Sequence, residues 1–273
     1  KNVEGIQISS PADDKERALR AIYRVHEKWY VDDVLAMCLK GGGNIDFDTY
    51  LTKDSFQVLI STTSAWLDCC QATLNDENEA TFALTRPPGH HATSCQAMGF
   101  CIINFAAATA MYALEELGAQ RISMLDFDVH YGNGVAAIVR KDSRIRYCSL
   151  HEKGSFPGTG LEESEGGPNK NIRTIEVEVG CSWKDNYSQR FEKEVIPWLL
   201  EHDPDILIVS AGYDALEDDE LANLCMQPED FYLISSKLKE SFGNRIMFGL
   251  EGGYAVEATS KAIKYTLQPF LEG

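Results

Sequence analysis

The sequence predicts an α/β fold with three layers, in which helices cover both faces of a mainly parallel central sheet. From residue 81 onward, short apolar segments alternate with longer segments of helical pattern. The short segments are apolar on both faces, as strands are when helices cover both sides of a parallel sheet. The chain has 273 residues, of which 44% are hydrophobic, and it shows no linker or internal repeat. These observations predict a single domain over residues 1–273.

The predicted elements follow one another in a regular order. The first 80 residues are expected to be mainly helical, with a polar loop at Gly41–Asp48. Strands are expected over residues 81–85, 121–127, 144–150, 172–179, 205–212 and 245–253. Helices are expected over residues 103–118, 134–141, 184–202, 228–242 and 256–271. Gly118 supplies a stop signal after the first of these helices, and Pro228 opens the fourth.

The composition narrows the class of protein. The net charge is −17, from 25 basic and 42 acidic residues, which disfavours direct binding to nucleic acid and favours cationic ligands. An acidic surface also keeps a protein soluble. No apolar stretch is long enough for a transmembrane helix, so no membrane partner is expected. The eight cysteines form no CxxC pair, and Cys101 and Cys148 lie in apolar runs. Reduced thiols of this kind indicate an intracellular protein of the cytoplasm, the nucleus or both.

Polar residues gather where predicted strands end. Five such endings read RPPGHHA (Arg86–Ala92), DFDVHYGNG (Asp126–Gly134), SLHEKGSFPGTG (Ser149–Gly160), SAGYDA (Ser210–Ala215) and LEGGY (Leu250–Tyr254). In an open parallel sheet the ligand binds beyond the carboxyl ends of the strands. We therefore expect these loops to carry the chemistry.

The second ending has the most informative spacing. In an extended segment, residues two apart share a face, so Asp126, Asp128 and His130 should point one way. Phe127 and Val129 should then point into the packed core. An apolar strand that ends by presenting two carboxylates and an imidazole predicts a polar site.

A metal ion is the ligand that this pattern suits best. Asp128 and His130 can offer an oxygen and a nitrogen to one ion, and Asp214 is the best candidate for a third ligand. Two carboxylates and one imidazole, with a position left for water, suit catalytic zinc, with ferrous iron as the alternative. Two other interpretations stay open. An Asp-x-His segment can cap a turn, and Asp214 can cap a helix that begins after it.

Further residues suit a hydrolase. His90 and His91 follow Gly89 and two prolines, which fix the backbone and suit a preorganised pair. Hydrolysis of an amide needs a base for water and an acid for the leaving amine, and two imidazoles can divide that work. Asp126 can hold the second nitrogen of one imidazole. Tyr254 can donate a hydrogen bond to an oxyanion opposite the metal, unless it is simply a core tyrosine.

In combination, RPPGHHA, DFDVHYGNG, SFPGTG, SAGYDA and EGGY resemble the motifs of the zinc-dependent histone deacetylases, especially the class II-like and bacterial or algal members. The resemblance runs from about Ser9 to the C-terminus. It implies the arginase–deacetylase fold, a three-layer α/β/α domain on a mainly parallel sheet. The first strand of that fold and its HPERP-like segment have no counterpart here, so we expect a catalytic domain truncated at its N-terminus.

The resemblance also implies two kinds of bound ion. The zinc ligands would be Asp128, His130 and Asp214. A structural potassium ion would be held, largely through backbone carbonyls, near Asp126, Asp128, His130, Ser149 and Leu150.

The resemblance assigns catalytic roles to the remaining polar residues. His91 would be the main general base and acid, and His90, paired with Asp126, would be its electrostatic partner. Asn133 would orient the second histidine. Tyr254 would polarise the acetyl carbonyl.

The substrate tunnel is implied in the same way, with lining residues Gly99, Phe100, Phe156 and Leu221. Leu221 stands where polyamine deacetylases carry a gatekeeping glutamate, which favours acetyl-lysine, although Glu220 beside it keeps the question open. Tyr131 replaces a histidine that usually follows the ligand histidine. A rim carboxylate, Asp46 or Asp48, would grip the substrate main chain, unless that loop is simply solvated.

The implied function is a zinc-dependent amidohydrolase that removes acetyl groups from N-acetyl-lysine in histones or other proteins, with a role in chromatin regulation. One alternative is a deacetylase of small acetylated amines, such as acetylpolyamines. Another is a weakly active acyl-lysine-binding scaffold in a corepressor complex. An arginase-like dimanganese hydrolase would need a further aspartate, and position 132 is Gly.

Overall fold

The centre of the structure is a parallel sheet. The computed structural model describes residues 5–12, 14–76, 79–161 and 166–272. Within these residues the sheet has six strands in the order β3-β8-β7-β4-β5-β6, and every pairing is parallel. The strands are β3 (Thr81–Ala83), β4 (Ile122–Asp126), β5 (Ile145–Glu152), β6 (Ile172–Val177), β7 (Ile206–Ala211) and β8 (Ile246–Leu250). All of them lie within or overlap the segments predicted as strands.

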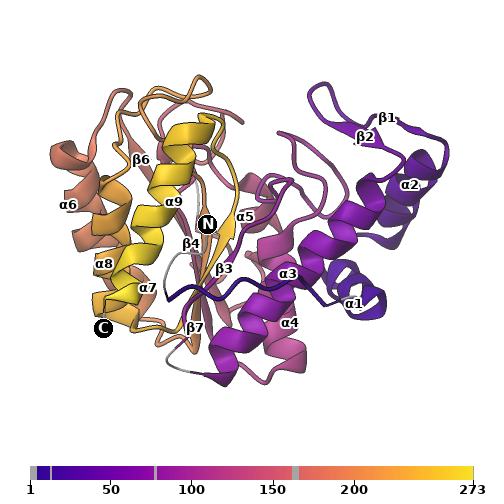
Figure 1. Ribbon diagram of the computed structural model, residues 1–273, viewed down its shortest axis with the longest axis horizontal. Coiled ribbons are helices and arrows are strands. Elements are labelled where there is room, and N and C mark those ends of the chain that lie inside the picture. The colour runs from indigo at the N-terminus through magenta and orange to yellow at the C-terminus, as the bar shows by residue number, and fades with distance from the viewer. Residues whose placement is uncertain (1–4, 13, 77–78, 162–165, 273) are drawn as a thin grey trace.

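Helices cover both faces of this sheet, which confirms the predicted three layers (Figure 1). One face carries α1 (Lys15–Val25), α2 (Lys28–Leu39), α3 (Ser55–Asn75), α4 (Phe105–Glu116) and α5 (Asn133–Val139). The other carries η1 (Trp183–Tyr187), α6 (Ser188–Arg190), η2 (Phe191–Val195), α7 (Ile196–Leu200), α8 (Asp230–Phe242) and α9 (Val256–Leu271). None of the helices described is long and apolar enough to cross a membrane.

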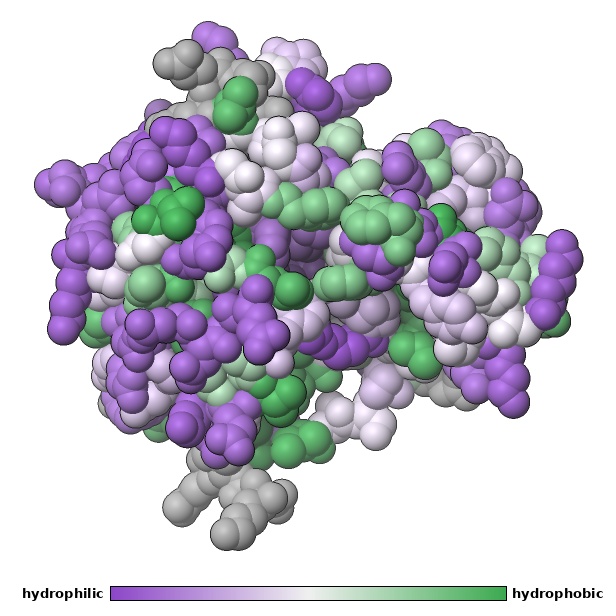
Figure 2. Space-filling model, turned by 90° about the horizontal axis from the view of Figure 1, so that it is seen from above, coloured by the Kyte–Doolittle hydropathy of each residue, from purple (hydrophilic) through white to green (hydrophobic). Residues whose placement is uncertain are grey.

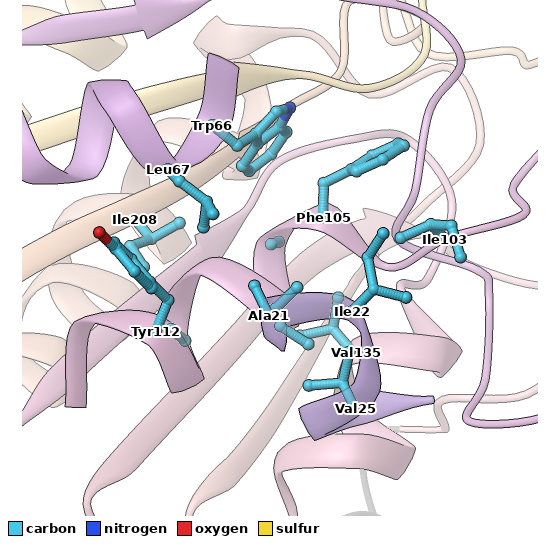
Figure 3. Packing of buried hydrophobic residues seen from close by; sticks show 14 of the residues in the cluster. Ala21, Ile22, Val25, Trp66, Leu67, Ile103, Phe105, Tyr112, Val135 and Ile208 are labelled. Atoms are coloured by element: carbon cyan, nitrogen blue, oxygen red, sulfur yellow. The ribbon is translucent and has the colours of Figure 1, made fainter. Parts of the chain in front are cut away.

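The strands divide the apolar core into two layers. Along β7, Ile206 and Ile208 pack toward α1–α5, whereas Leu207 and Val209 pack toward the opposite helices. Figure 3 shows Ile208 among the side chains of the first layer. Because neighbouring residues of a strand point to opposite faces, a strand buried on both sides is apolar at most positions. Its few polar residues, such as Ser123 and Ser210, are hydrogen-bonded. Burial on both sides explains the continuous apolar runs on which the fold prediction depends.

The predicted loop at Gly41–Asp48 is wrong in part, because it contains a strand. β1 (Gly42–Asn44) pairs antiparallel with β2 (Tyr50–Thr52), and the hairpin projects beside α2 (Figure 1). Gly42 has a φ of +98°, and a Cβ there would lie 2.1 Å from the carbonyl oxygen of Leu51. Glycine therefore permits this close approach of two backbones, a use of glycine in strands that a loop-like composition conceals.

The predicted helix over residues 184–202 is present but irregular. It is built from η1, α6, η2 and α7, in which π-helical turns alternate with α-helical ones. Asp185 has a non-helical backbone (φ −77°, ψ −125°), and Pro197 stands at the start of α7. Proline is tolerated in the first turn of an α-helix but interrupts the hydrogen bonds of a continuous one, and π-turns of this kind occur as local bulges within helices.

The carboxyl ends of the strands meet at one edge of the sheet, which lies at the top of Figure 1. The loops that follow β3, β4, β5, β7 and β8 all emerge there. Figure 2 looks onto this edge and shows a hollow near the middle of the molecule. The polar strand endings are therefore brought to one place, as the sequence predicts.

Candidate active site

The three predicted metal ligands converge. One ligand atom from each of Asp128, His130 and Asp214 lies within 4.8 Å of the others. Nδ1 of His130 is 3.1 Å from Oδ1 of Asp128 and 3.2 Å from Oδ2 of Asp214. Phe127 and Val129, the intervening residues, are buried in the second core layer. The alternating directions predicted from the sequence are therefore present, and they place three donors around one point.

Backbone groups fix the two carboxylates. Gly252 N donates to Oδ2 of Asp128 at 2.8 Å, and Val129 N donates to Oδ1 of Asp214 at 3.1 Å. A Cβ at Gly252 would lie 2.0 Å from Oδ2 of Asp214, and one at Gly212 would lie 2.2 Å from Oδ2 of Asp128. The glycines of EGGY and SAGYDA are thus required by contact with the carboxylates, and the donors are held without freedom to rotate away.

The charges of Asp128, His130 and Asp214 favour a bound cation between the two carboxylates. Asp128 and Asp214 are 0% and 1% exposed. Burial and the neighbouring Asp128 raise the pKa of Asp214 to about 6. Burial opposes charge on His130, but hydrogen bonds to Asp128 and Asp214 outweigh it and raise the pKa of His130 to about 11. Two buried carboxylates this close repel each other unless positive charge lies between them. The donor set therefore fits a divalent metal ion.

The histidine pair lies directly beside the metal ligands. Nδ1 of His90 is 3.1 Å from Oδ2 of Asp126, and its Nε2 is 3.7 Å from Oδ1 of Asp128. Nδ1 of His91 is 2.8 Å from Oδ1 of Asn133, so the ring nitrogen is the donor. The two imidazole centroids are 3.9 Å apart. Each histidine is thus oriented by the partner predicted for it, and the two rings are in contact.

The environment drives the two histidines toward different protonation states. Burial disfavours charge on His90, but Asp128 and Asp126 outweigh it and raise the pKa of His90 to about 10. Burial and the neighbouring His90 lower the pKa of His91 well below its usual value. Neighbouring groups whose pKa values are pushed apart are suited to divided acid–base roles. His91 is therefore the neutral ring of the pair at neutral pH.

Tyr254 lies close enough to Asp128 and Asp214 for their charges to act on its hydroxyl. Its ring centroid is 5.7 Å from that of Phe100 and 5.0 Å from the guanidinium of Arg86. Burial and the charges of Asp128 and Asp214 raise the pKa of the phenol. The hydroxyl therefore stays protonated at neutral pH and can act as a hydrogen-bond donor.

Three of the four predicted tunnel residues lie against these groups. The Phe156 ring lies 4.9 Å from that of His91, edge to face, and Phe100 lies edge-on to Tyr254. A Cβ at Gly99 would lie 2.5 Å from Cδ2 of His91. Leu221 is 46% exposed, and its backbone N–H donates to Asp219. Phe156 and Gly99 therefore lie against His91, and Phe100 lies against Tyr254.

Replacement of Gly99 by alanine should displace His91. Gly99 has a φ of +55°, and the added Cβ would also lie 2.9 Å from Cε1 of Phe156. We expect Gly99→Ala to lower kcat/KM by about 10- to 100-fold, since small misplacement of a reacting group is costly. Gly154→Ala is the matched control, because Gly154 has a φ of +75° but open space around it. Steady-state kinetics of both variants check this, and equal losses would attribute the effect to backbone strain alone.

Other predicted residues lie close to the site, but their roles stay predictions. Asp126 and Ser149 are register partners in neighbouring strands, and Oγ of Ser149 is 3.0 Å from Nδ1 of His151. Leu150 follows Ser149 in β5, so these two predicted potassium ligands lie on the strand next to Asp126. Tyr131 is buried with its ring centroid 5.1 Å from that of His151. Asp48 lines a cavity of about 290 Å³ beside Phe100.

Sequence reasoning assigned no role to several residues that hold the site together. Oδ2 of Asp219 accepts from Tyr254 N at 2.6 Å, and its Oδ1 accepts from Leu221 N at 3.1 Å. The hydroxyl of Tyr147 donates to Oδ2 of Asp126 at 2.7 Å. Glu251 is fully buried beneath the histidine pair. The only signal for Glu251 is a charged residue at the end of an apolar strand, and Tyr147 has none.

Comparison with known proteins agrees with these features. The family model described as "Histone deacetylase domain" matches residues 4–270. An uncharacterized protein of Synechocystis is 41% identical over 92% of this chain and 81% of its own length. The chloroplastic histone deacetylase 10 of Oryza sativa subsp. japonica is 33% identical over 98% of this chain, which corresponds to 64% of the rice protein.

A solved structure extends the likeness to three dimensions. The crystal structure of the HDA15 HD domain superposes with a TM-score of 0.88 at 28% sequence identity, and the match covers 98% of this chain and 77% of that one. The predicted arginase–deacetylase architecture is therefore confirmed.

Proposed function

This chain belongs to the histone deacetylase family, and on that premise we propose that it is a zinc-dependent amidohydrolase that removes acetyl groups from lysine side chains of proteins. The observation that carries the proposal is the joint arrangement of three buried metal donors, two histidines of opposed pKa and a protonated tyrosine. These groups together supply every proton transfer and hydrogen bond that amide hydrolysis needs.

Asp128, His130 and Asp214 would hold the metal ion. Zinc is proposed because two carboxylates and one imidazole form a typical catalytic zinc set, and ferrous iron accepts the same donors. A bound zinc ion would supply Lewis acidity to water and to the acetyl carbonyl. We also propose a structural potassium ion near Ser149.

The chain's own residues divide the remaining work. His91 would take a proton from the attacking water, because its ring is neutral and Asn133 fixes its orientation. His90, held by Asp126, would remain charged and stabilise the negative charge that develops nearby. The Tyr254 hydroxyl would donate to the carbonyl oxygen as that oxygen becomes anionic. His91 would then return the proton to the departing lysine amine.

The aromatic side chains beside His91 and Tyr254 support a lysine side chain as substrate. Phe156 and Phe100 border the approach to His91 and Tyr254, and their rings suit the apolar methylene stem of lysine. Leu221, the residue proposed for the entrance, carries no charge that would select a polyamine. However, Glu217, Asp218 and Glu220 beside it are exposed, so small acetylated amines are retained as the second candidate.

Acetate release from two substrates tests the proposal. An acetyl-lysine peptide should be hydrolysed with a higher kcat/KM than N-acetylspermidine, and a hydroxamate chelator should abolish both reactions. Metal analysis of the purified protein should find zinc. Preferred turnover of acetylspermidine would select the second candidate. Peptide binding without acetate release from zinc-loaded protein would instead favour the scaffold alternative.

Leu221→Glu should shift the preference toward polyamines. Leu221 is 46% exposed, so solvent would partly screen a charge introduced there. We therefore expect a modest effect: the ratio of kcat/KM for acetylspermidine to kcat/KM for the peptide should rise about fivefold. Glu220→Gln is the matched control, and it should change this ratio in the opposite direction if the exposed charge contributes. An unchanged ratio in Leu221→Glu would remove Leu221 from the entrance.

Partners and compartment are parts of the same proposal. Acetylated histone tails, other acetylated proteins and a corepressor complex are the proposed partners, and chromatin regulation is the proposed role. The cytoplasm or nucleus is the predicted compartment. The chloroplastic name of the rice relative adds a plastid to the compartments to be checked, by imaging a fluorescent fusion of the full gene product.

A further inference from the structure

A buried carboxylate lies under the histidine pair. Glu251 follows β8 directly and is 0% exposed. Its Oε2 accepts from two consecutive backbone amides, Gly89 N at 2.6 Å and His90 N at 3.1 Å. Its Oε1 accepts from Oγ of Ser210, on the neighbouring strand, at 3.0 Å. Both oxygens are thus engaged, and one of them holds the main chain of the histidine loop.

The loop that carries His90 and His91 (residues 86–92, the histidine loop) makes further contacts with the Glu251 segment through Arg86. Nη1 of Arg86 donates to the carbonyl oxygen of Glu251 at 2.6 Å, and Nη2 donates to that of Gly253 at 2.8 Å. The guanidinium also lies 5.0 Å from the ring of Tyr254. Four hydrogen bonds, all donated by the segment that carries the two histidines, therefore join it to Glu251 and Gly253, which directly precede Tyr254.

The histidine loop needs such an anchor because it has no regular secondary structure. Residues 86–92 belong to no helix or strand. Gly89 packs so closely that a Cβ there would lie 2.7 Å from the carbonyl oxygen of Ile103. Each imidazole meets its partner, Asp126 or Asn133, through a single ring nitrogen, so a shift of the main chain would move both rings away from these partners.

We propose that Glu251 is a positioning residue for the reaction: it fixes the main chain at Gly89 and His90 and thereby sets the two imidazoles relative to Tyr254. The kinetic part of this proposal rests on the proposed function. Glu251 binds neutral backbone and hydroxyl donors directly, and the charge of His90 is held chiefly by Asp128 and Asp126, with Glu251 contributing less. The role therefore depends mainly on where the acceptor oxygens lie. A neutral side chain of the same length should therefore preserve the positioning role of Glu251, whereas a charged but shorter side chain should not.

Two conservative variants separate these properties. Glu251→Gln keeps the length and an oxygen for both amides, and its NH2 group can donate to Ser210. Glu251→Asp keeps the charge but withdraws the oxygens by one methylene. We expect kcat per titrated site to stay within about threefold of wild type for Glu251→Gln and to fall about 10- to 100-fold for Glu251→Asp, with KM changed less than about twofold. Titration with a tight hydroxamate counts the active sites.

A readout independent of activity accompanies the kinetics. Exchange of the Gly89 and His90 amide hydrogens, measured on the full chain, should be slow in wild type and in Glu251→Gln and faster in Glu251→Asp. Asp205 provides the matched control. Its Oδ2 accepts from Gln120 N at 2.6 Å and from Arg121 N at 2.9 Å, just before β7 at the opposite edge of the sheet. Asp205→Ala should lower the melting temperature and leave kcat per titrated site unchanged.

The outcomes are decisive in either direction. Wild-type kcat in Glu251→Asp, or equal losses in Glu251→Gln and Glu251→Asp, would overturn the positioning role. If Glu251→Asp does not fold, the activity and amide protection of Glu251→Gln still decide, since a loss of either contradicts the proposal. If wild type hydrolyses no acetylated substrate, the proposed function fails, while hydrogen exchange still tests the anchor.

Discussion

Tyr254→Phe is expected to fold, to keep its metal ion and to lose acetate release by about 10²- to 10³-fold in kcat, the usual cost of removing one oxyanion donor. Phenylalanine preserves the ring contact with Phe100 and the position above Arg86, so the wall of the site should stay intact. Only the hydroxyl is removed. Steady-state kinetics on an acetyl-lysine peptide, together with metal content, check the result.

The chemistry of Tyr254 explains why a large effect is expected. Its pKa is raised by burial and by Asp128 and Asp214, so the phenol holds its proton at neutral pH and does not compete as an anion for the metal. Tyr50→Phe is the matched control, because Tyr50 lies on β2 with 62% of its surface exposed. That variant should retain turnover, and full turnover in Tyr254→Phe would remove the hydroxyl from the proposed reaction.

The residues that could be located from sequence share a local signal. Asp126, Asp128 and His130 follow an apolar strand at a spacing that fixes their common face, and the rule that parallel strands present ligands at their carboxyl ends brings Asp214 to the same edge. Each of these inferences needs only the strand, its direction and the period of its side chains. The fold and the metal donors were therefore predictable without knowledge of any loop conformation.

The residues that the sequence did not predict act through contacts with backbone groups that are distant along the chain. Glu251 holds amides that lie 162 and 161 residues away, and Asp219 holds Tyr254 N from 35 residues away. Nothing in the local pattern of either acid distinguishes it from a surface carboxylate. The hairpin at β1 and β2 was missed for a related reason, since the glycines that composition assigns to a loop serve there to let two backbones approach.

Asp214→Asn should have opposite effects on stability with and without metal. Asparagine keeps the shape and can still accept from Val129 N, but it removes a charge that Asp128 repels. The pKa of Asp214 is raised to about 6 in the fold, so ionisation costs stability at pH 7, and this cost disappears as the pH falls below the unfolded value of 3.8. In chelator at pH 7, Asp214→Asn should therefore melt higher than wild type, and the difference should shrink toward pH 4.

With zinc present, the order of stability should reverse. Wild type gains stability from a ligand that binds only the folded state, whereas Asp214→Asn has lost one of the predicted donors and gains little. Acetate release should fall by about 10³-fold or more in this variant, because metal assistance is worth several kcal/mol of transition-state stabilisation. Asp218→Asn, an exposed neighbour, should behave as wild type in every assay. Equal zinc-induced shifts in melting temperature for wild type and Asp214→Asn would exclude Asp214 as a ligand, because a charge that only repels Asp128 cannot make stability depend on the metal.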